Sequence, residues 1–149
     1  MIVFVFGSNL AGIHGSGAAR DALHQWGAKF NQGTGPQGES YAIPTKDENI
    51  QSLPLSEIAR YVRQFIGYAR NHPEIDFQVT RVGCGLAGYD DSQIAPMFAG
   101  APDNCHLPLG WRKIICPHKR QVTPEGHYTS FRCLDCGVVA PVERTGLRS

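Results

Sequence analysis

A continuous apolar run at the start of the chain narrows the range of folds that it can adopt. Residues 2–6 read Ile-Val-Phe-Val-Phe, without the polar and apolar alternation of a half-buried strand. Such a β-branched and aromatic run predicts a strand buried on both faces, as in a parallel sheet. A small-residue loop over 7–17 and a predicted helix over 18–26 follow it, and Gly27 stands where a helix-terminating glycine is typical.

Further segments continue this alternation of strand and helix. Residues 41–45 and 77–82 each predict a strand. Between them, apolar residues recur on one helical face from residue 58 onward, with Ser56 as the expected N-cap and Pro73 just beyond the end. This order predicts an α/β fold, a mixed sheet flanked by helices. The other predicted elements are a loop over 31–38, a short helix from about residue 92 and a weak strand over 105–109.

Charge and cysteine divide the chain in two. Residues 1–111 hold seven Lys or Arg and ten Asp or Glu, a net charge of −3, whereas residues 112–149 hold seven and three, a net charge of +4. The overall charge of +1 excludes a strongly basic nucleic-acid coat. Three of the five cysteines lie in the shorter segment, and an odd count favours metal ligation over a disulfide framework. We predict two domains, 1–111 and 112–149.

The second of these units carries a zinc-ligand pattern. Cys116 and His118 form one pair, and Cys133 and Cys136 form a Cys-x-x-Cys-Gly knuckle. Zinc takes four such ligands in tetrahedral geometry, so we predict a zinc ribbon that folds on one structural zinc ion, with His127 as the alternative fourth ligand. The basic excess of this ribbon suits nucleic acid, a protein partner or a cap on the first unit, and the sequence leaves all three open.

Two predicted strands end in glycine-rich loops that lead into helices. Glycine lets backbone N–H groups approach a ligand closely, and a helix N-terminus favours an anion. Ligands of open α/β sheets bind beyond the carboxyl ends of the strands. The two loops therefore predict a site for two phosphates or one diphosphate, the alternative being that the glycines serve only the turns. Neither the dinucleotide fingerprint nor a Walker lysine is present.

Four motifs resemble those of macrodomains in their order and spacing, over residues 1–111. The resemblance is greatest to compact macro-like proteins carried by phages and bacteria. It implies a macrodomain-like sheet, binding of ADP-ribose or a related diphosphate nucleotide, and a role in phage counter-defence. The motifs are Gly7-Ser-Asn9, Gly12-x-His-Gly-x-Gly-Ala-Ala19, Tyr41-Ala-Ile-Pro-Thr-Lys46 and Val82-Gly-Cys-Gly-Leu-Ala-Gly88.

The resemblance also assigns site residues. Asn9 lies beside the distal ribose, and Lys46 resembles the lysine with which one branch of the family attacks ribose C1. Ala87 stands at the position of that branch's aspartate, which favours binding over turnover. The implied catalytic residues are Lys46, Asn9 and His14. The implied ligand-binding residues are Gly7, Ser8, Asn9, Gly12, His14, Gly15, Gly17, Ala18, Gly83, Cys84, Gly85, Leu86, Ala87, Gly88 and Tyr89.

Each singled-out side chain also has a structural interpretation. Asn9 suits a cap on the first loop, and Lys46 suits a solvated surface position. His14 suits either a phosphate contact, acid–base chemistry or a hydrogen bond to the loop backbone. Cys84 fits a small buried residue better than a nucleophile, and Tyr89 fits either a stacking contact or the core.

Two functional hypotheses follow from the sequence. The first is a binder of an ADP-ribose-type nucleotide, with hydrolysis of an ADP-ribose linkage on protein or nucleic acid left open. The second is a non-catalytic adaptor or nucleotide sponge whose ribbon binds nucleic acid or a protein. The apolar start is too short for a signal peptide or a membrane span, so we expect a cytoplasmic protein with no membrane partner. The oligomeric state stays open.

Overall fold

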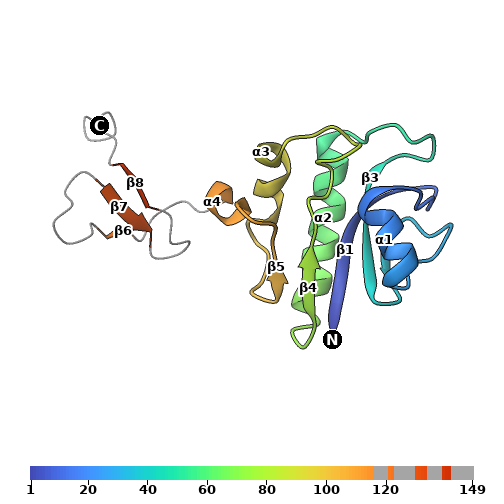
Figure 1. Cartoon of the computed structure of the whole chain (residues 1–149), viewed down its shortest axis with the longest axis horizontal. Coiled ribbons are helices and arrows are strands. Elements are labelled where there is room, and N and C mark those ends of the chain that lie inside the picture. Colours follow the sequence, from blue (N-terminus) through green and yellow to red (C-terminus); the bar gives the residue numbers. More distant parts are fainter. Residues whose placement is uncertain (116–120, 123–129, 134–138, 142–149) are drawn as a thin grey trace.

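The computed structural model describes residues 1–115, 121–122, 130–133 and 139–141. Residues 1–115 form a five-stranded mixed sheet with helices packed against it (Figure 1). β2 is antiparallel to β3, and the other pairs are parallel. The predicted α/β fold is confirmed in this form. In spatial order the strands are β2 (Gly35–Gln37), β3 (Ser40–Lys46), β1 (Ile2–Asn9), β4 (Asp76–Val79) and β5 (Cys105–His106).

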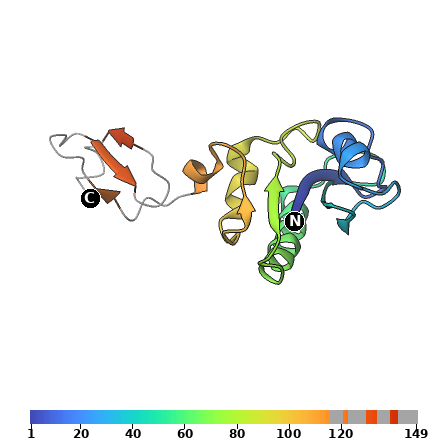
Figure 2. The ribbon, with the colours of Figure 1, turned by 60° about the horizontal axis from the view of Figure 1, so that its bottom comes forward.

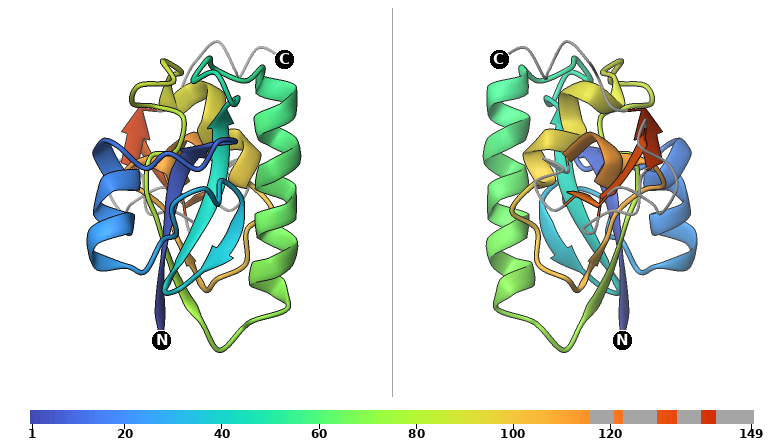
Figure 3. Two further views of the ribbon diagram at one scale, coloured as in Figure 1. Left: turned by 90° about the vertical axis from the view of Figure 1, so that its right-hand side faces the viewer. Right: turned by 90° about the vertical axis from the view of Figure 1, so that its left-hand side faces the viewer.

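Helices cover both faces of this sheet (Figures 2 and 3). The helix α1 (Gly17–Gln25) packs with Phe4 and Phe6 of β1, whereas α2 (Leu55–Arg70) packs with Val3 and Val5. Successive strand residues point to opposite faces, so β1 is buried on both. The prediction of a strand covered on both faces is confirmed from Val3 to Phe6, whereas Ile2 at its start is exposed.

The helix α2 forms because its apolar residues fall on one face. Ile58, Val62 and Phe65 are fully buried, and the ring of Phe65 lies 5.0 Å from that of Tyr41. The expected N-cap at Ser56 is wrong. Pro54 occupies that position with φ −63° and ψ 152°, and its carbonyl accepts the first two hydrogen bonds of the helix.

Several element bounds differ from the sequence-based expectation. The predicted loop over 31–38 contains β2, and β4 ends at Val79 rather than at residue 82. The helix α3 (Asp91–Ile94) begins after a capping box formed by Asp90 and Gln93, and continues into the 3₁₀ helix η1 (Ala95–Phe98). The last predicted strand is only β5, two residues long.

A helix, α4 (Trp111–Ile115), spans the predicted domain boundary. Its first residue is buried against η1, and its last packs against the core that contains α2. A separate antiparallel sheet contains β6 (Gln121–Val122), β7 (Ser130–Cys133) and β8 (Val139–Pro141) in that order. No helix in these described segments is long and apolar enough to cross a bilayer. Of the predicted zinc ligands, Cys133 ends β7, and Cys116, His118, Cys136 and the alternative His127 lie outside the described residues.

Candidate functional site

A cavity of about 280 Å³ lies at the carboxyl ends of β1, β3 and β4. The connection after β1 leads through α1 to β3 on one side of β1, whereas the connection after β4 leads to β5 on the other side. The cavity therefore opens at the point where the strand order reverses. Ligands of open α/β sheets bind at this kind of position.

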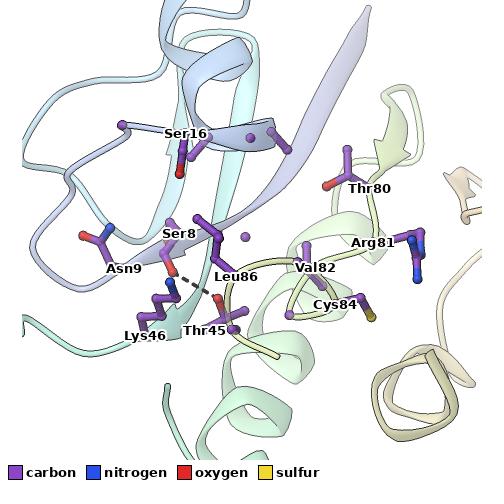
Figure 4. Close-up of a pocket in the computed structure, with 18 of the residues that line it drawn as sticks. Ser8, Asn9, Ser16, Thr45, Lys46, Thr80, Arg81, Val82, Cys84 and Leu86 are labelled. Carbon is purple, nitrogen blue, oxygen red and sulfur yellow. Dashed lines mark hydrogen bonds between the residues drawn. The ribbon is translucent and has the colours of Figure 1, made fainter. Parts of the chain in front are cut away.

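A bulge between β1 and β3 shapes the floor of the cavity. Ser8 pairs with Pro44 but Asn9 pairs with Lys46, so Thr45 is an extra residue on β3. Proline has no N–H to donate to the ladder, and the irregularity begins there. In a regular strand, successive side chains point to opposite faces, so only one of Thr45 and Lys46 would face the cavity. With the bulge, both line it (Figure 4).

The first glycine loop forms one wall with its backbone. Within the described structure, the N–H groups of residues 15–19 donate no hydrogen bond. Ser16 occupies the N-cap of α1, but its hydroxyl makes no capping hydrogen bond. Residues 15–19 all line the cavity, and such free N–H groups at the start of a helix attract anions.

The second glycine loop forms the opposite wall. The N–H groups of Gly83, Gly85, Leu86 and Ala87 make no hydrogen bond among the described residues. All four residues line the cavity. Two separate loops that carry free N–H groups thus line one cavity.

Contacts from the loop after β3 brace this second wall. Ser52 Oγ donates a hydrogen bond to the carbonyl of Ala87 at 2.7 Å, and Tyr89 Oη donates one to the carbonyl of Leu53 at 2.6 Å. The second glycine loop is therefore held to the segment that follows Lys46. Tyr89 serves this bracing contact and does not line the cavity.

The side chains that line the cavity carry positive charge. Lys46 and Arg81 are on its wall, and no Asp or Glu of the described chain lines it. This contrasts with the net charge of −3 over residues 1–111. In Figure 4 the side chain of Lys46 points toward the space between the loops, whereas Arg81 points away. The cavity is suited to an anion.

Asp91 connects the second wall to α4. Its carboxylate accepts hydrogen bonds from Nε and Nη2 of Arg81, both at 2.9 Å, and from Nε1 of Trp111 at 2.7 Å. The hydrogen bonds from Arg81, and after them that from Trp111, lower the pKa of Asp91 to about 2. One carboxylate therefore fixes a residue of the cavity wall and the first residue of α4.

Acid should weaken the fold through Asp91. Because its folded-state pKa lies below the unfolded value of 3.8, its contribution to stability is present above about pH 4 and is lost as the pH falls through about 2. We expect the urea midpoint of the wild type to fall over this range, and Asp91→Asn to be less stable at pH 7 and flatter below pH 4. Asp103→Asn, at an exposed position, is the control. Equal acid profiles for wild type and Asp91→Asn would contradict this assignment.

No family model matches the chain, and neither does any curated protein or solved structure.

Most of the ligand-binding residues expected from the sequence do meet in this cavity. Gly12, His14, Gly88 and Tyr89 do not line it. The expected residues that line it are Gly7, Ser8, Asn9, Gly15, Gly17, Ala18, Lys46, Gly83, Cys84, Gly85, Leu86 and Ala87.

His14 lies away from the cavity wall, against the expectation of a phosphate contact or acid–base role. It is 2% exposed, and its Nε2–H donates to the carbonyls of Lys29 at 2.9 Å and Gln32 at 3.1 Å. The preceding Gly12 has φ +72°, and a Cβ there would lie 2.3 Å from the backbone nitrogen of Gln32. The two residues therefore pack the first loop against residues 29–33. This agrees with the structural interpretation of His14.

Asn9 lines the cavity, but both the nitrogen and the oxygen of its side-chain amide form hydrogen bonds within the first glycine loop. Nδ2 donates to the carbonyl of Ile13 at 2.7 Å, and Oδ1 accepts from the N–H of Ile13 at 3.0 Å. The side chain closes the turn at the end of β1, as a structural cap does. One N–H of Nδ2 and one lone pair of Oδ1 remain for a ligand, whose position these two hydrogen bonds would help to fix.

Cys84 has the properties of a structural thiol. Burial, and after it a hydrogen bond to Asp91, raises the pKa of this thiol to about 11. A thiolate is the nucleophilic form of cysteine, and at neutral pH it is disfavoured here. Cys84 is half-buried rather than buried, and the structural interpretation is favoured over a nucleophile.

Sequence reasoning missed several residues of the cavity wall. Thr45 enters it through the bulge, which a proline near the end of a predicted strand could have suggested. Arg81 immediately precedes the second glycine motif, and a cation there was a usable signal. The missed lining residues are Ile13, Ser16, Ala19, Thr45, Thr80, Arg81 and Val82.

Proposed function

We propose that the cavity binds a nucleotide of the ADP-ribose type through its diphosphate. The observation that carries this proposal is the set of donors on the cavity wall. Two loops with free backbone N–H groups line one space, Lys46 adds a positive charge, and no carboxylate of the described residues lines it. Donor-rich, cationic surfaces of this kind favour phosphate oxygens.

The choice of ADP-ribose among phosphate ligands rests on the sequence motifs. The loops over 12–18 and 83–89 resemble the two phosphate loops of macrodomains, and most of their residues line the cavity. The position at the reversal of strand order agrees with a nucleotide site. The macrodomain-like identity is part of this proposal.

Binding is favoured over turnover because no carboxylate of the described residues lines the cavity beside Lys46. Oδ1 of Asp47 accepts hydrogen bonds from the N–H groups of Asn49 and Gln51. Asp90 caps α3, and Asp91 holds Arg81. A lysine that attacks ribose C1 needs a partner to move the proton, and none of these carboxylates lines the cavity.

ADP-ribose should raise the melting temperature of the wild-type protein. At a concentration 100 times Kd, linkage gives about 2.7 kcal/mol of stabilisation, or roughly 10 °C for a domain of this size. Lys46→Ala should weaken binding about tenfold, or 1.4 kcal/mol, because it removes the free cation from the wall. Lys29→Ala, at an exposed position outside the cavity, is the matched control. Differential scanning fluorimetry and titration calorimetry measure both effects.

Two other outcomes would change this proposal. No thermal shift with any diphosphate nucleotide would sink the binding proposal and favour the adaptor hypothesis. Release of ADP-ribose from a modified protein or nucleic acid by the wild type, but not by Lys46→Ala, would add hydrolysis to binding.

We also propose a structural zinc ion in the second unit. The backbone register supports it: Gln121 of β6 pairs with Cys133 of β7. His118 precedes Gln121 by three residues, and Cys136 follows Cys133 by three. The two halves of the ligand pattern are therefore attached to neighbouring positions of one hairpin, as a single tetrahedral site requires. The donor set of thiolates and imidazole is one that zinc prefers.

A further inference from the structure

The polar groups of the cavity wall differ in whether they are free to meet a ligand. Thr80 Oγ1 donates to the carbonyl of Val5 at 2.7 Å, and Thr45 Oγ1 donates to that of Ser8 at 3.3 Å. Asn9 and Arg81 are also engaged, with Ile13 and with Asp91.

The groups with a proton free for a ligand are therefore few. Ser16 Oγ and Lys46 Nζ form no hydrogen bond within the described structure, and the N–H groups of the two glycine loops are free as well. The hydroxyl oxygens of Thr45 and Thr80 donate their protons to the backbone and can only accept from a ligand. Lys46 and the free N–H groups only donate, and Ser16 Oγ can do both. The natural partners of these donors are the phosphate and hydroxyl oxygens of a sugar phosphate.

Two apolar side chains complete the wall, one from each glycine loop. Ile13 is 45% exposed and Leu86 is 75% exposed, although both line the cavity. Figure 4 shows Leu86 extending into the space between the loops. A ligand that covers an exposed leucine removes apolar surface from water, which stabilises the complex. The carbon face of a sugar ring is such a cover, and it lies beside the phosphates of the ligand.

The size of the cavity sets a limit on how much of a nucleotide it encloses. Its volume of about 280 Å³ lies just below the range of small-molecule pockets, roughly 300–1,000 Å³. A sugar with its phosphates matches this space better than a whole dinucleotide.

We propose that the cavity encloses the phosphorylated sugar end of its ligand and leaves the base outside, so that affinity does not depend on which base is attached. The ligand class is then sugar phosphates and nucleoside diphosphate sugars in general. This inference rests on the proposed function, because it assumes that the phosphates bind between the two loops.

A ligand panel tests the inference. Calorimetry would compare ADP-ribose with its guanosine and uridine counterparts, with ribose 5-phosphate and with adenosine. We expect the three diphosphate sugars to bind within about threefold of one another, ribose 5-phosphate to bind more weakly, and adenosine not to bind. A loss of more than tenfold on changing the base overturns the inference and leaves the proposed function intact. No binding by any phosphate compound overturns both.

A second measurement tests the role of Leu86. Leu86→Ala should weaken every sugar-bearing ligand by a similar factor, about tenfold, and leave inorganic pyrophosphate unchanged. Leu109→Ala is the matched control, since Leu109 is fully exposed and does not line the cavity. Unchanged affinity for ribose 5-phosphate in Leu86→Ala would overturn the assignment of the sugar to this wall. A loss confined to ADP-ribose would show that Leu86 contacts the base instead.

Discussion

Replacing Gly33 with alanine is expected to destabilise the protein by about 3 kcal/mol, a fall in melting temperature of roughly 10 °C. A Cβ at Gly33 would lie 2.1 Å from the carbonyl oxygen of Asn9 and 3.0 Å from Cα of Leu10. These are backbone atoms at the end of β1, so the clash can be relieved only by moving the strand or the loop. The carbonyl of Gly33 also accepts a hydrogen bond from Ser8, which the same movement would break. Chemical denaturation measures the loss.

Gly85→Ala is the matched control for this prediction. Apart from its chain neighbours, its Cβ would meet no atom of the described residues within 4 Å, so the stability of this variant should stay within about 0.5 kcal/mol of the wild type. Because Gly85 lines the cavity, Gly85→Ala is expected to change ligand binding rather than stability. A wild-type denaturation midpoint for Gly33→Ala would show that residues 29–33 do not pack against β1 as described.

The second large effect concerns Cys133. If four ligands hold one zinc ion, Cys133→Ser should remove the metal and with it the sheet of β6, β7 and β8, since structural zinc supplies on the order of 10 kcal/mol to folding in small zinc domains. Metal analysis should find about one zinc per wild-type chain and almost none in the variant. Protease sensitivity beyond residue 115 should rise in parallel.

Cys84→Ser provides the control for zinc binding. Cys84 belongs to the cavity wall of the first unit, so its loss should leave the zinc content unchanged. Wild-type protein that is free of zinc, yet resists proteolysis along residues 116–149, would end the zinc proposal.

The regular parts of the fold were predictable because their patterns are local. The apolar run of β1 and the one-sided apolar face of α2 each follow from a single period along the chain. β2 was missed because its three residues lie in a segment rich in glycine, and only pairing with β3 makes them a strand. The strand over 77–82 was predicted too long because Val82 is apolar and buried. Its N–H bonds to the carbonyl of Thr80, in a tight turn beyond the end of β4.

The site was predictable in its backbone and less so in its side chains. Glycine spacing marks the two loops, because a backbone that approaches a ligand requires small residues. It does not distinguish Gly85, which faces the cavity, from Gly12, which allows close packing against Gln32. The role of His14 could not be decided from the sequence for the same reason. The carbonyls that its ring contacts belong to Lys29 and Gln32, 15 and 18 residues away in the chain, and meet it only in the folded structure.

The shared carboxylate at Asp91 determines where the chain can be divided. Trp111 donates to Asp91 from the first turn of α4, and Ile115 at the other end of that helix packs against the core. A shortened protein ending at residue 111 would keep the indole but lose the helix that seats it, and the hydrogen bond that helps to fix Arg81 would weaken with it. The part of this chain suited to independent expression therefore extends through Ile115. A fusion or truncation made beyond residue 115 should therefore keep α4 in the same protein as the residues that form the cavity.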